Sequence, residues 1–315
     1  MIMLSIVLPV YKVEPWIERC LRSIIEDPGF AGSCELIVVD DGSPDGSIEI
    51  AERVCLGRMD VRFIRQENQG LGAARNAGAA AIRGDYLWFV DSDDWLADMG
   101  VSRVLQAIYS QPKVDILNID YVMSNGKRST VANSAINGKI YSGIEYLSIS
   151  IVQNPVQYYI FSTDYYKRRG LKFLSGIYHE DALFTPVALV DAERVMRVAQ
   201  DCYVYNIREG SIMKSGNYLK HALDMMRVVE DLESFRLLHE KKCSGASVLA
   251  DYSALGVGGI YYYWKKLDRQ GRAQVADRLR FLTLLIPVLR SKRLKFLFVV
   301  AAMWMSSIGR TKASN

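Results

Sequence analysis

Three aspartates stand at the end of an apolar stretch. The segment LWFVDSDDWL, residues 87–96, places Asp91, Asp93 and Asp94 directly after four apolar residues. Carboxylates at a strand end cost free energy unless a cation or solvent offsets their charge. Because residues i and i+2 of an extended chain point the same way, Asp91 and Asp93 can share one ligand. Paired oxygen ligands favour Mg²⁺ or Mn²⁺, and the alternative is a solvated turn or a helix N-cap at Asp94.

A second acidic pair follows another apolar run, in VVDDGSPDGS. Asp40 and Asp41 could accept hydrogen bonds from a base N–H and from ribose hydroxyls, and Gly42 permits a tight turn beside them. An Asx turn that caps a helix starting at Ser47 is the alternative for the Ser and Asp residues further along. That alternative does not account for two adjacent carboxylates at the end of a strand.

A glycine-rich segment, NQGLGAARNAG, supplies positive charge. Gly70 and Gly72 precede a predicted helix that carries Arg75 and Asn76 in its opening turns. Backbone amides and a guanidinium near a helix N-terminus favour an anion. The same letters also fit an ordinary small-residue helix packed on a sheet, so the segment is a weak signal by itself.

These clusters need a scaffold that brings them together, and the apolar pattern predicts one. Strand-like and helical patterns alternate four times within the first 90 residues, which indicates an α/β fold with a mostly parallel sheet. Ligands of such sheets bind at the carboxyl ends of the strands. The polar clusters fall at those ends, so we expect a single site there. Residues 100–215 are less regular, and helical patterns dominate from residue 217 onward. The expected strands are 4–11, 34–39, 61–66 and 85–90.

Charge is distributed unevenly along the chain. The formal net charge is +4, but residues 265–315 carry 12 Lys and Arg against Asp268 and Asp277. A basic tail favours an anionic surface. No apolar run reaches the roughly 20 residues of a membrane-spanning helix. Residues 296–309, behind the basic run RSKRLK, are expected to form either a buried helix or an interfacial helix with Trp304 at the lipid boundary.

The five scattered cysteines contain no CxxC pair, which favours reduced thiols in a cytosolic protein. The N-terminus lacks a basic leader region and a small-residue cleavage site, and we expect it to form a first core strand. His179, His221 and His239 lack the spacing of metal ligands and are expected to be surface or helix-packing residues. A third metal ligand from His221 is the weaker alternative.

Taken together and in this order, the motifs resemble those of family-2 glycosyltransferases with the GT-A fold, over roughly residues 3–215. The matching segments are SIVLPVYK, ELIVVDDGSPDGS, NQGLGAARNAG, GDYLWFVDSDDWL and YHEDALF. The resemblance implies a mixed, mostly parallel sheet flanked by helices. It also implies a catalytic domain at 1–215, with a nucleotide-sugar half at 1–98 and an acceptor half at 99–215, followed by a helical, basic extension at 216–315.

The resemblance also implies roles for individual residues. Asp41 would bind the uracil with Asp40 close by, and Arg208 could fold over the diphosphate as part of a lid. The metal, Mn²⁺ or Mg²⁺, would be held by Asp91 and Asp93, with Asp93 preferred as the direct ligand. Asp181 would be the catalytic base, with Glu180 beside it; the alternative for both is a helix N-terminus that favours acids. The implied donor-binding residues are Pro9, Val10, Tyr11, Asp40, Asp41, Gly72, Arg75, Asp91, Ser92, Asp93 and Arg208.

The implied activity is inverting transfer of one sugar from a UDP-sugar to a lipid-linked oligosaccharide. This chemistry needs a carboxylate to deprotonate the acceptor and a divalent ion for the leaving diphosphate. The chain lacks the QxxRW element of processive synthases. We therefore expect a non-processive enzyme of bacterial surface polysaccharide synthesis at the inner face of the cell membrane, with no nucleic-acid partner. A sugar-phosphate nucleotidyltransferase would typically have a glycine-rich loop after the first strand, and this class is disfavoured because the segment at that position, PVYKVEPW, has no glycine. A non-catalytic nucleotide- or glycan-binding module is the other alternative.

Overall fold

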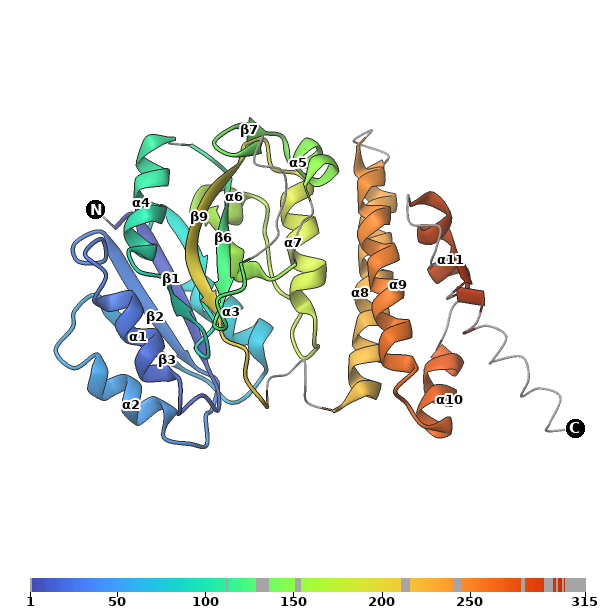
Figure 1. Cartoon of the computed structure of the whole chain (residues 1–315), viewed down its shortest axis with the longest axis horizontal. Helices are drawn as coiled ribbons and strands as arrows, with labels where there is room; N and C mark the ends of the chain where they lie inside the picture. The colour runs from blue at the N-terminus through green and yellow to red at the C-terminus, as the bar shows by residue number, and fades with distance from the viewer. Residues whose placement is uncertain are drawn as a thin grey trace, which may run out of the picture. The chain divides into compact units, whose positions relative to one another are not determined.

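The structure, a computed structural model, divides the chain into two compact units (Figure 1). It describes residues 2–111, 113–128, 136–150, 154–210, 216–240, 245–278 and 281–291, and residues 297, 298, 300, 301 and 303. The first unit comprises residues 1–176 and 191–208, and the second comprises residues 177–190 and 209–315. This division differs from the expected boundary at 215, because residues 177–190 group with the C-terminal helices rather than with the acceptor half.

The first unit contains a nine-stranded sheet in the order β3-β2-β1-β4-β8-β6-β9-β5, with β7 paired to β9. Its first strands pair in parallel, β1 with β2 and β4, and β2 with β3. Every residue of β1 is buried, as expected for a central strand that is covered on both faces. The predicted alternation is confirmed, with β1 (Leu4–Val10), α1 (Ile17–Ile25), β2 (Cys34–Asp40), α2 (Ser47–Val54), β3 (Val61–Arg65), α3 (Leu71–Ala80) and β4 (Tyr86–Phe89).

Helix α3 packs closely on the parallel strands because Gly78 has no side chain. A Cβ atom there would lie 2.3 Å from Val7 Cγ1, closer than packed atoms approach, and 3.1 Å from Val39 Cγ2, a tight contact. Val7 and Val39 belong to neighbouring strands, so α3 covers one face of β1 and β2. The position of α3 matters for function, since its first turns carry Arg75 and Asn76.

The remainder of the sheet is mixed. Strand β8 runs antiparallel to β4 and to β6, while β9 runs parallel to β6 and carries the short antiparallel strands β5 and β7. This confirms a mixed sheet whose parallel pairings are concentrated in its first half. The elements are β5 (Trp95–Leu96), α4 (Gly100–Ser110), β6 (Ile116–Met123), β7 (Ile140–Tyr141), α5 (Gly143–Ile149), the 3₁₀ helix η2 (Val156–Tyr158), β8 (Tyr159–Ser162), α6 (Thr163–Arg168) and β9 (Val195–Tyr205).

The second unit is helical, as predicted from residue 217 onward. Helices α8 and α9 pack against each other, and Gly256 permits their close approach because a Cβ there would lie 2.5 Å from Val229 Cγ2. Their core is aliphatic and aromatic, with Met225, Val257 and Ile260 among its buried members. The elements are α7 (Glu180–Val190), α8 (Tyr218–Glu240), the 3₁₀ helix η4 (Ala246–Val248), α9 (Leu249–Trp264), α10 (Arg269–Arg278) and α11 (Phe281–Arg290).

The C-terminal segment is described only in part. Among the described helices, none has the length and apolar character needed to cross a bilayer. Val300 and Met303 are buried, whereas the Phe298 side chain is exposed. The basic residues 292–295 and Trp304, on which the expectation of an interfacial helix depends, lie outside the described residues.

Candidate active site

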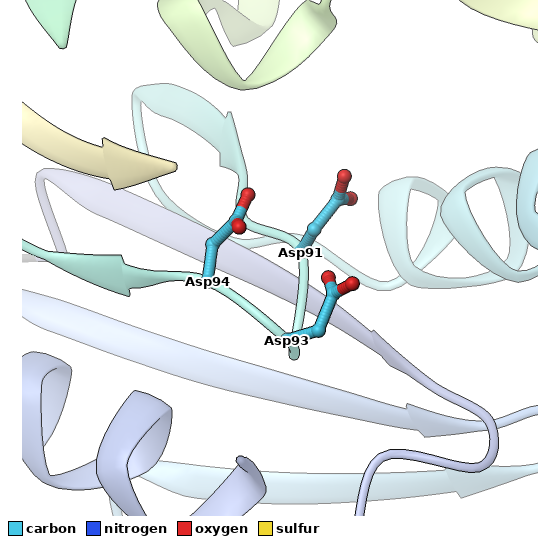
Figure 2. A group of neighbouring side chains, drawn as sticks. All are labelled: Asp91, Asp93 and Asp94. Atoms are coloured by element: carbon cyan, nitrogen blue, oxygen red, sulfur yellow. The ribbon is translucent and has the colours of Figure 1, made fainter. Parts of the chain in front are cut away.

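The three aspartates after β4 form one turn, residues 91–94, which we call the acidic turn. The Asp94 amide donates to the Asp91 carbonyl at 3.1 Å and closes it. One carboxylate oxygen from each of Asp91, Asp93 and Asp94 lies within 4.8 Å of the others, and Figure 2 shows the side chains projecting from the same loop. Ser92 Oγ donates to the Pro9 carbonyl at 2.6 Å, so the acidic turn is fixed to the end of β1.

The Asp91 carboxylate forms an ion pair with a buried arginine. Arg75 Nη2 lies 2.7 Å from Asp91 Oδ1, and the Arg75 side chain is only 2% exposed. The other oxygen, Oδ2, accepts a hydrogen bond from Gln157 of η2. The guanidinium also lies 5.3 Å from the Phe173 ring centroid. Arg75 was predicted to face the donor's diphosphate or sugar, and in the structure its guanidinium binds the Asp91 carboxylate.

Asp93 pairs with the arginine that was predicted to belong to a lid. Arg208 Nε donates to Asp93 Oδ2 at 2.7 Å, and the Arg208 guanidinium carbon lies 4.2 Å from the Trp16 ring centroid. The Asp93 side chain is 24% exposed, against 17% for Asp91. Burial and the nearby Asp91 raise the pKa of Asp93. Crowding of like charge at an accessible carboxylate is what a bound cation would relieve.

Asp94 has a supporting position. It is 2% exposed; its Oδ2 accepts from the Tyr203 hydroxyl at 2.6 Å and its Oδ1 accepts from the Asn206 amide at 2.8 Å. Burial, together with the charges of Asp93 and Asp91, raises the pKa of Asp94 well above its usual range. The next helix, α4, begins at Gly100 rather than at Asp94. Asp94 therefore joins the acidic turn to β9 and does not cap a helix.

The acidic turn has the donor set of a divalent-cation site. Within the described residues it is the one group of three potential metal ligands, and all its ligand atoms are hard oxygens. Arg75 and Arg208 bring two positive charges against three carboxylates. Asp93 and Asp91 are the more accessible members, so these two residues fit the predicted ligands best.

The second acidic pair lies at the end of β2. Asp41 is 2% exposed; Oδ1 accepts from Gln66 Nε2 at 2.7 Å and from the Gln69 amide at 2.9 Å, and Oδ2 accepts from the Gly70 amide at 2.9 Å. Its carboxylate thus anchors the chain that leads into α3. Asp40 is half-buried, with Oδ1 accepting from the Ser43 amide at 2.9 Å. Of the two, Asp40 offers the more accessible group to a ligand.

The other predicted donor residues differ in accessibility. Tyr11 is exposed, whereas Pro9 and Val10 are buried at the end of β1. Gly72 allows the chain to approach α3, because a Cβ there would lie 2.7 Å from the Leu174 carbonyl. Asn76 fixes the same approach through paired hydrogen bonds with the backbone of Phe173, both 2.9 Å long. Gly72 and Asn76 therefore position residues 173–174 beside α3.

The predicted base lies in the second unit. Glu180 and Asp181 form the first turn of α7, with Glu180 buried and Asp181 half-buried. His179, immediately before the helix, has a left-handed backbone with φ of 64°. The structure thus brings Pro9, Asp91, Ser92, Asp93, Arg75 and Arg208 together within the first unit, while Glu180 and Asp181 belong to the second.

Sequence reasoning missed several residues that contact the acidic turn. Gln157 binds Asp91, Tyr203 binds Asp94, and Trp16 lies beneath Arg208. Asn206 donates from its side chain to the Asp93 carbonyl at 3.0 Å. Tyr203 and Asn206 share the segment YVYNIR with Arg208, so its polar residues could have been included. Gln157 carries no signal in the sequence, because only the pairing of β8 with β4 brings it near Asp91.

Comparison with known proteins identifies bacterial relatives, several of which are named glycosyltransferases. Glycosyltransferase EpsJ of Bacillus subtilis, described as uncharacterized, is 32% identical over 218 residues, which are 67% of this chain and 62% of EpsJ. Glycosyltransferase GlyA of Streptococcus pneumoniae is 32% identical over 67% of this chain but only 31% of its own length. The minor teichoic acid biosynthesis protein GgaA of B. subtilis is 28% identical over 66% of this chain and 48% of its own. The matched part is thus shorter than two thirds of each of these relatives.

Solved structures share the fold. S. aureus TarS 1–349 in complex with UDP-GlcNAc aligns over 99% of this chain and 92% of its own, with a TM-score of 0.68 and 18% identity. The mannosyltransferase PcManGT of Pyrobaculum calidifontis, in complex with GDP-Man and Mn²⁺, aligns over 98% and 86%, with a TM-score of 0.53 and 13% identity. The family pattern named Glycosyl transferase family 2 matches residues 5–173, more than half of the chain. This chain, with its GT-A fold, therefore belongs to glycosyl transferase family 2.

Proposed function

We propose that the protein is an inverting, metal-dependent glycosyltransferase that moves one sugar from a UDP-sugar to a lipid-linked glycan in bacterial surface polysaccharide synthesis. The observation that carries this proposal is the acidic turn, where three carboxylates share one small region with Arg75 and Arg208 on two of them. Its position at the carboxyl ends of β1 and β4 is where sheets of this kind bind nucleotides. Family membership favours glycosyl transfer over nucleotidyl transfer.

In this proposal the nucleotide binds along the ends of β1 and β2. Tyr11 is exposed and can contact the base, and the half-buried Asp40 can accept hydrogen bonds from base or ribose. Asp41, Gly72 and Ser92 are proposed to act indirectly. Asp41 and Gly72 fix the chain around the start of α3, and Ser92 fixes the acidic turn. The donor-binding role of these three is therefore to position backbone and neighbouring side chains.

The diphosphate is proposed to lie against the acidic turn. Asp93 and Asp91 would hold Mn²⁺ or Mg²⁺, which when bound neutralises charge on the departing diphosphate. Arg208 is the residue that can change partners: its guanidinium can leave Asp93 for a phosphate oxygen, since it binds either oxyanion in the same way. Arg75, buried beneath Asp91, keeps that carboxylate in place.

The acceptor is proposed to be activated by Asp181. In an inverting transfer the acceptor hydroxyl loses its proton to a carboxylate as its oxygen bonds to the sugar carbon, and the bond from that carbon to the diphosphate breaks on the opposite side. Asp181, half-buried in the first turn of α7, is the proposed acceptor of that proton. Glu180 is buried and is the weaker candidate.

The proposed donor and the proposed pathway are supported by what related proteins bind or are named for. The S. aureus TarS structure holds UDP-GlcNAc, PcManGT holds GDP-Man, and GgaA is named for minor teichoic acid biosynthesis. We favour a UDP-sugar and a surface glycan on this basis. Isothermal titration with UDP and GDP, each with and without Mn²⁺, tests the nucleotide. The proposal expects UDP to bind at least about tenfold tighter than GDP, a difference of about 1.4 kcal/mol, and only with the metal. Equal or metal-independent binding would contradict it.

The acceptor is proposed to be presented at an anionic membrane on the inner face of the cell. The second unit exposes the side chains of Ile286, Leu289 and Phe298, which flank the basic run 290–295 in the sequence. Apolar side chains beside basic ones suit an anionic lipid surface. Deletion of residues 290–315 should release the protein from phosphatidylglycerol vesicles in a sedimentation assay, while UDP binding persists. Retained sedimentation would place the membrane contact elsewhere.

A further inference from the structure

The residue before the proposed base has an unusual backbone. His179 has φ of 64°, in the left-handed region that favours glycine, and its carbonyl accepts from the Ala182 amide at 3.0 Å as α7 begins. A histidine in this conformation persists only when its surroundings hold it. We call residues 178–181 the base turn, because they lead directly into Asp181.

A second histidine, from α8, holds the ring of His179. His221 Nδ1 and His179 Nε2 are 2.9 Å apart, a hydrogen-bond distance, and His221 is fully buried. Tyr263 of α9 stacks on the His221 ring with centroids 4.6 Å apart and planes 11° apart. The three rings, from α8, α9 and the base turn, therefore form one cluster inside the second unit.

The backbone of the base turn is held to α8 as well. The Tyr178 amide donates to Asp224 Oδ2 at 2.8 Å, and Asp224 forms an ion pair with Lys220, also at 2.8 Å. Asp224 lies one turn after His221 on α8, so two successive turns of one helix fix two successive residues of the base turn. These contacts hold the two residues that directly precede the first turn of α7.

We propose that His221 is a positioning residue for the proposed base: through its hydrogen bond to His179 it sets the orientation of the first turn of α7 and of Asp181. This inference rests on the proposed function. A hydrogen bond between two imidazole rings needs one ring nitrogen as donor and the other as acceptor. Burial and the neighbouring His221 lower the pKa of His179 to about 4, so its ring is neutral near pH 7. A neutral His179 ring adds no positive charge that would make Asp181 a weaker base.

The test compares two substitutions at one position. Asn in His221→Asn places a side-chain amide near the position of Nδ1 and can keep the hydrogen bond, whereas Phe in His221→Phe keeps a ring against Tyr263 but cannot form the bond. The probe is nucleoside diphosphate release from the fastest member of a panel of UDP-sugars with Mn²⁺, with water as acceptor. We expect His221→Phe to lower kcat on the order of 10- to 100-fold, since small misplacements of a catalytic group have effects of this size. The donor KM should stay within about twofold, and His221→Asn should recover most of the rate.

A second pair keeps the test decisive if His221→Phe does not fold. His179→Gly accepts the left-handed backbone but removes the ring, whereas His179→Gln keeps an amide near the position of Nε2. The inference expects His179→Gln to turn over faster than His179→Gly although glycine fits the backbone better. Equal rates, or a faster glycine variant, would overturn it.

Asp181→Asn, assayed in parallel, separates this inference from the proposal on which it rests. An active Asp181→Asn would remove the base assignment, and the positioning role with it. An inactive Asp181→Asn beside a His221→Phe variant with wild-type kcat would leave the base in place and overturn only the positioning role. Reduced kcat in both, with unchanged KM and thermal midpoint, is the result expected.

Discussion

The acidic turn and the base turn both present carboxylates, but they are held by different means. In the acidic turn Asp91 and Asp93 each contact an arginine, and Asp94 contacts a phenol and an amide. In the base turn the His179 ring contacts the rings of His221 and Tyr263, and burial lowers the pKa of His179 to about 4, so its ring is neutral near pH 7. Arginines can exchange a carboxylate for a phosphate, which suits a diphosphate site. Neutral rings preserve the basicity of a nearby carboxylate, which suits proton transfer.

The largest effect should come from the base turn. Asp181→Asn should lower kcat roughly 10³-fold, the usual loss when a general base is removed, while UDP and Mn²⁺ bind as before. Rates of diphosphate release and titration of UDP measure the two effects separately. Glu180→Gln is the matched control and should retain more activity than Asp181→Asn. The reverse order would exchange the roles of the two acids.

Substitution in the acidic turn should weaken nucleotide binding, whereas substitution in the base turn should lower kcat. Asp93→Ala should weaken Mn²⁺-dependent UDP binding by roughly 100-fold, because it removes the most accessible carboxylate of the site. Asp98→Ala removes an exposed acid a few residues away and should bind UDP normally. Calorimetry measures the affinities and circular dichroism the fold. Unchanged affinity in Asp93→Ala would remove the metal from this turn.

The lowered pKa of His179 predicts a pH dependence of the free energy of unfolding. His179 has a pKa of about 4 when folded and of 6.5 when unfolded, so the unfolded chain binds more protons between these values. Its contribution is complete above pH 6.5 and is lost as the pH falls toward 4, by about 2 kcal/mol between pH 7 and pH 5, or about 30-fold in the unfolding equilibrium. The surrounding titratable groups are His221, Asp224, Tyr178 and Tyr263.

Urea unfolding at both pH values measures this component. The double variant His179→Gln/His221→Asn should lose less stability than wild type on going from pH 7 to pH 5. An equal loss in both proteins would show that His179 does not stay neutral in the folded state.

A smaller effect, with opposite signs for two ligands, is expected at Arg208. Arg208 binds the Asp93 carboxylate, so Arg208→Gln should bind Mn²⁺ alone a few-fold more tightly. The same variant should bind UDP with Mn²⁺ about tenfold more weakly, because a charged hydrogen bond to phosphate is lost. Electron paramagnetic resonance of free Mn²⁺ measures the first and calorimetry the second. Arg22→Gln, an exposed arginine of α1, is the control. Weaker Mn²⁺ binding in Arg208→Gln would contradict an exchange of partners.

Much of the first unit could be predicted from local patterns. The alternation of strands and helices up to residue 90 follows from apolar periodicity, and α2 begins at the predicted Ser47 and ends at Val54. The convergence of the Asp40 and Asp91 clusters at one edge follows from parallel pairing, in which strand ends must meet. These features are local or follow from topology, and for that reason the amino-acid sequence alone predicts them.

The contacts that distinguish one carboxylate from another required the tertiary structure. Asp40 and Asp41 are adjacent and identical in type, yet only the fold of residues 66–70 buries Asp41. Likewise His221 lies 42 residues from His179, and nothing in their spacing announces a hydrogen bond. The sequence by itself determined the strands, the helices and the edge where acids gather, because these depend on near neighbours. Which acid stays accessible, and which ring supports which turn, was decided by packing between distant segments, where burial and hydrogen bonding are set.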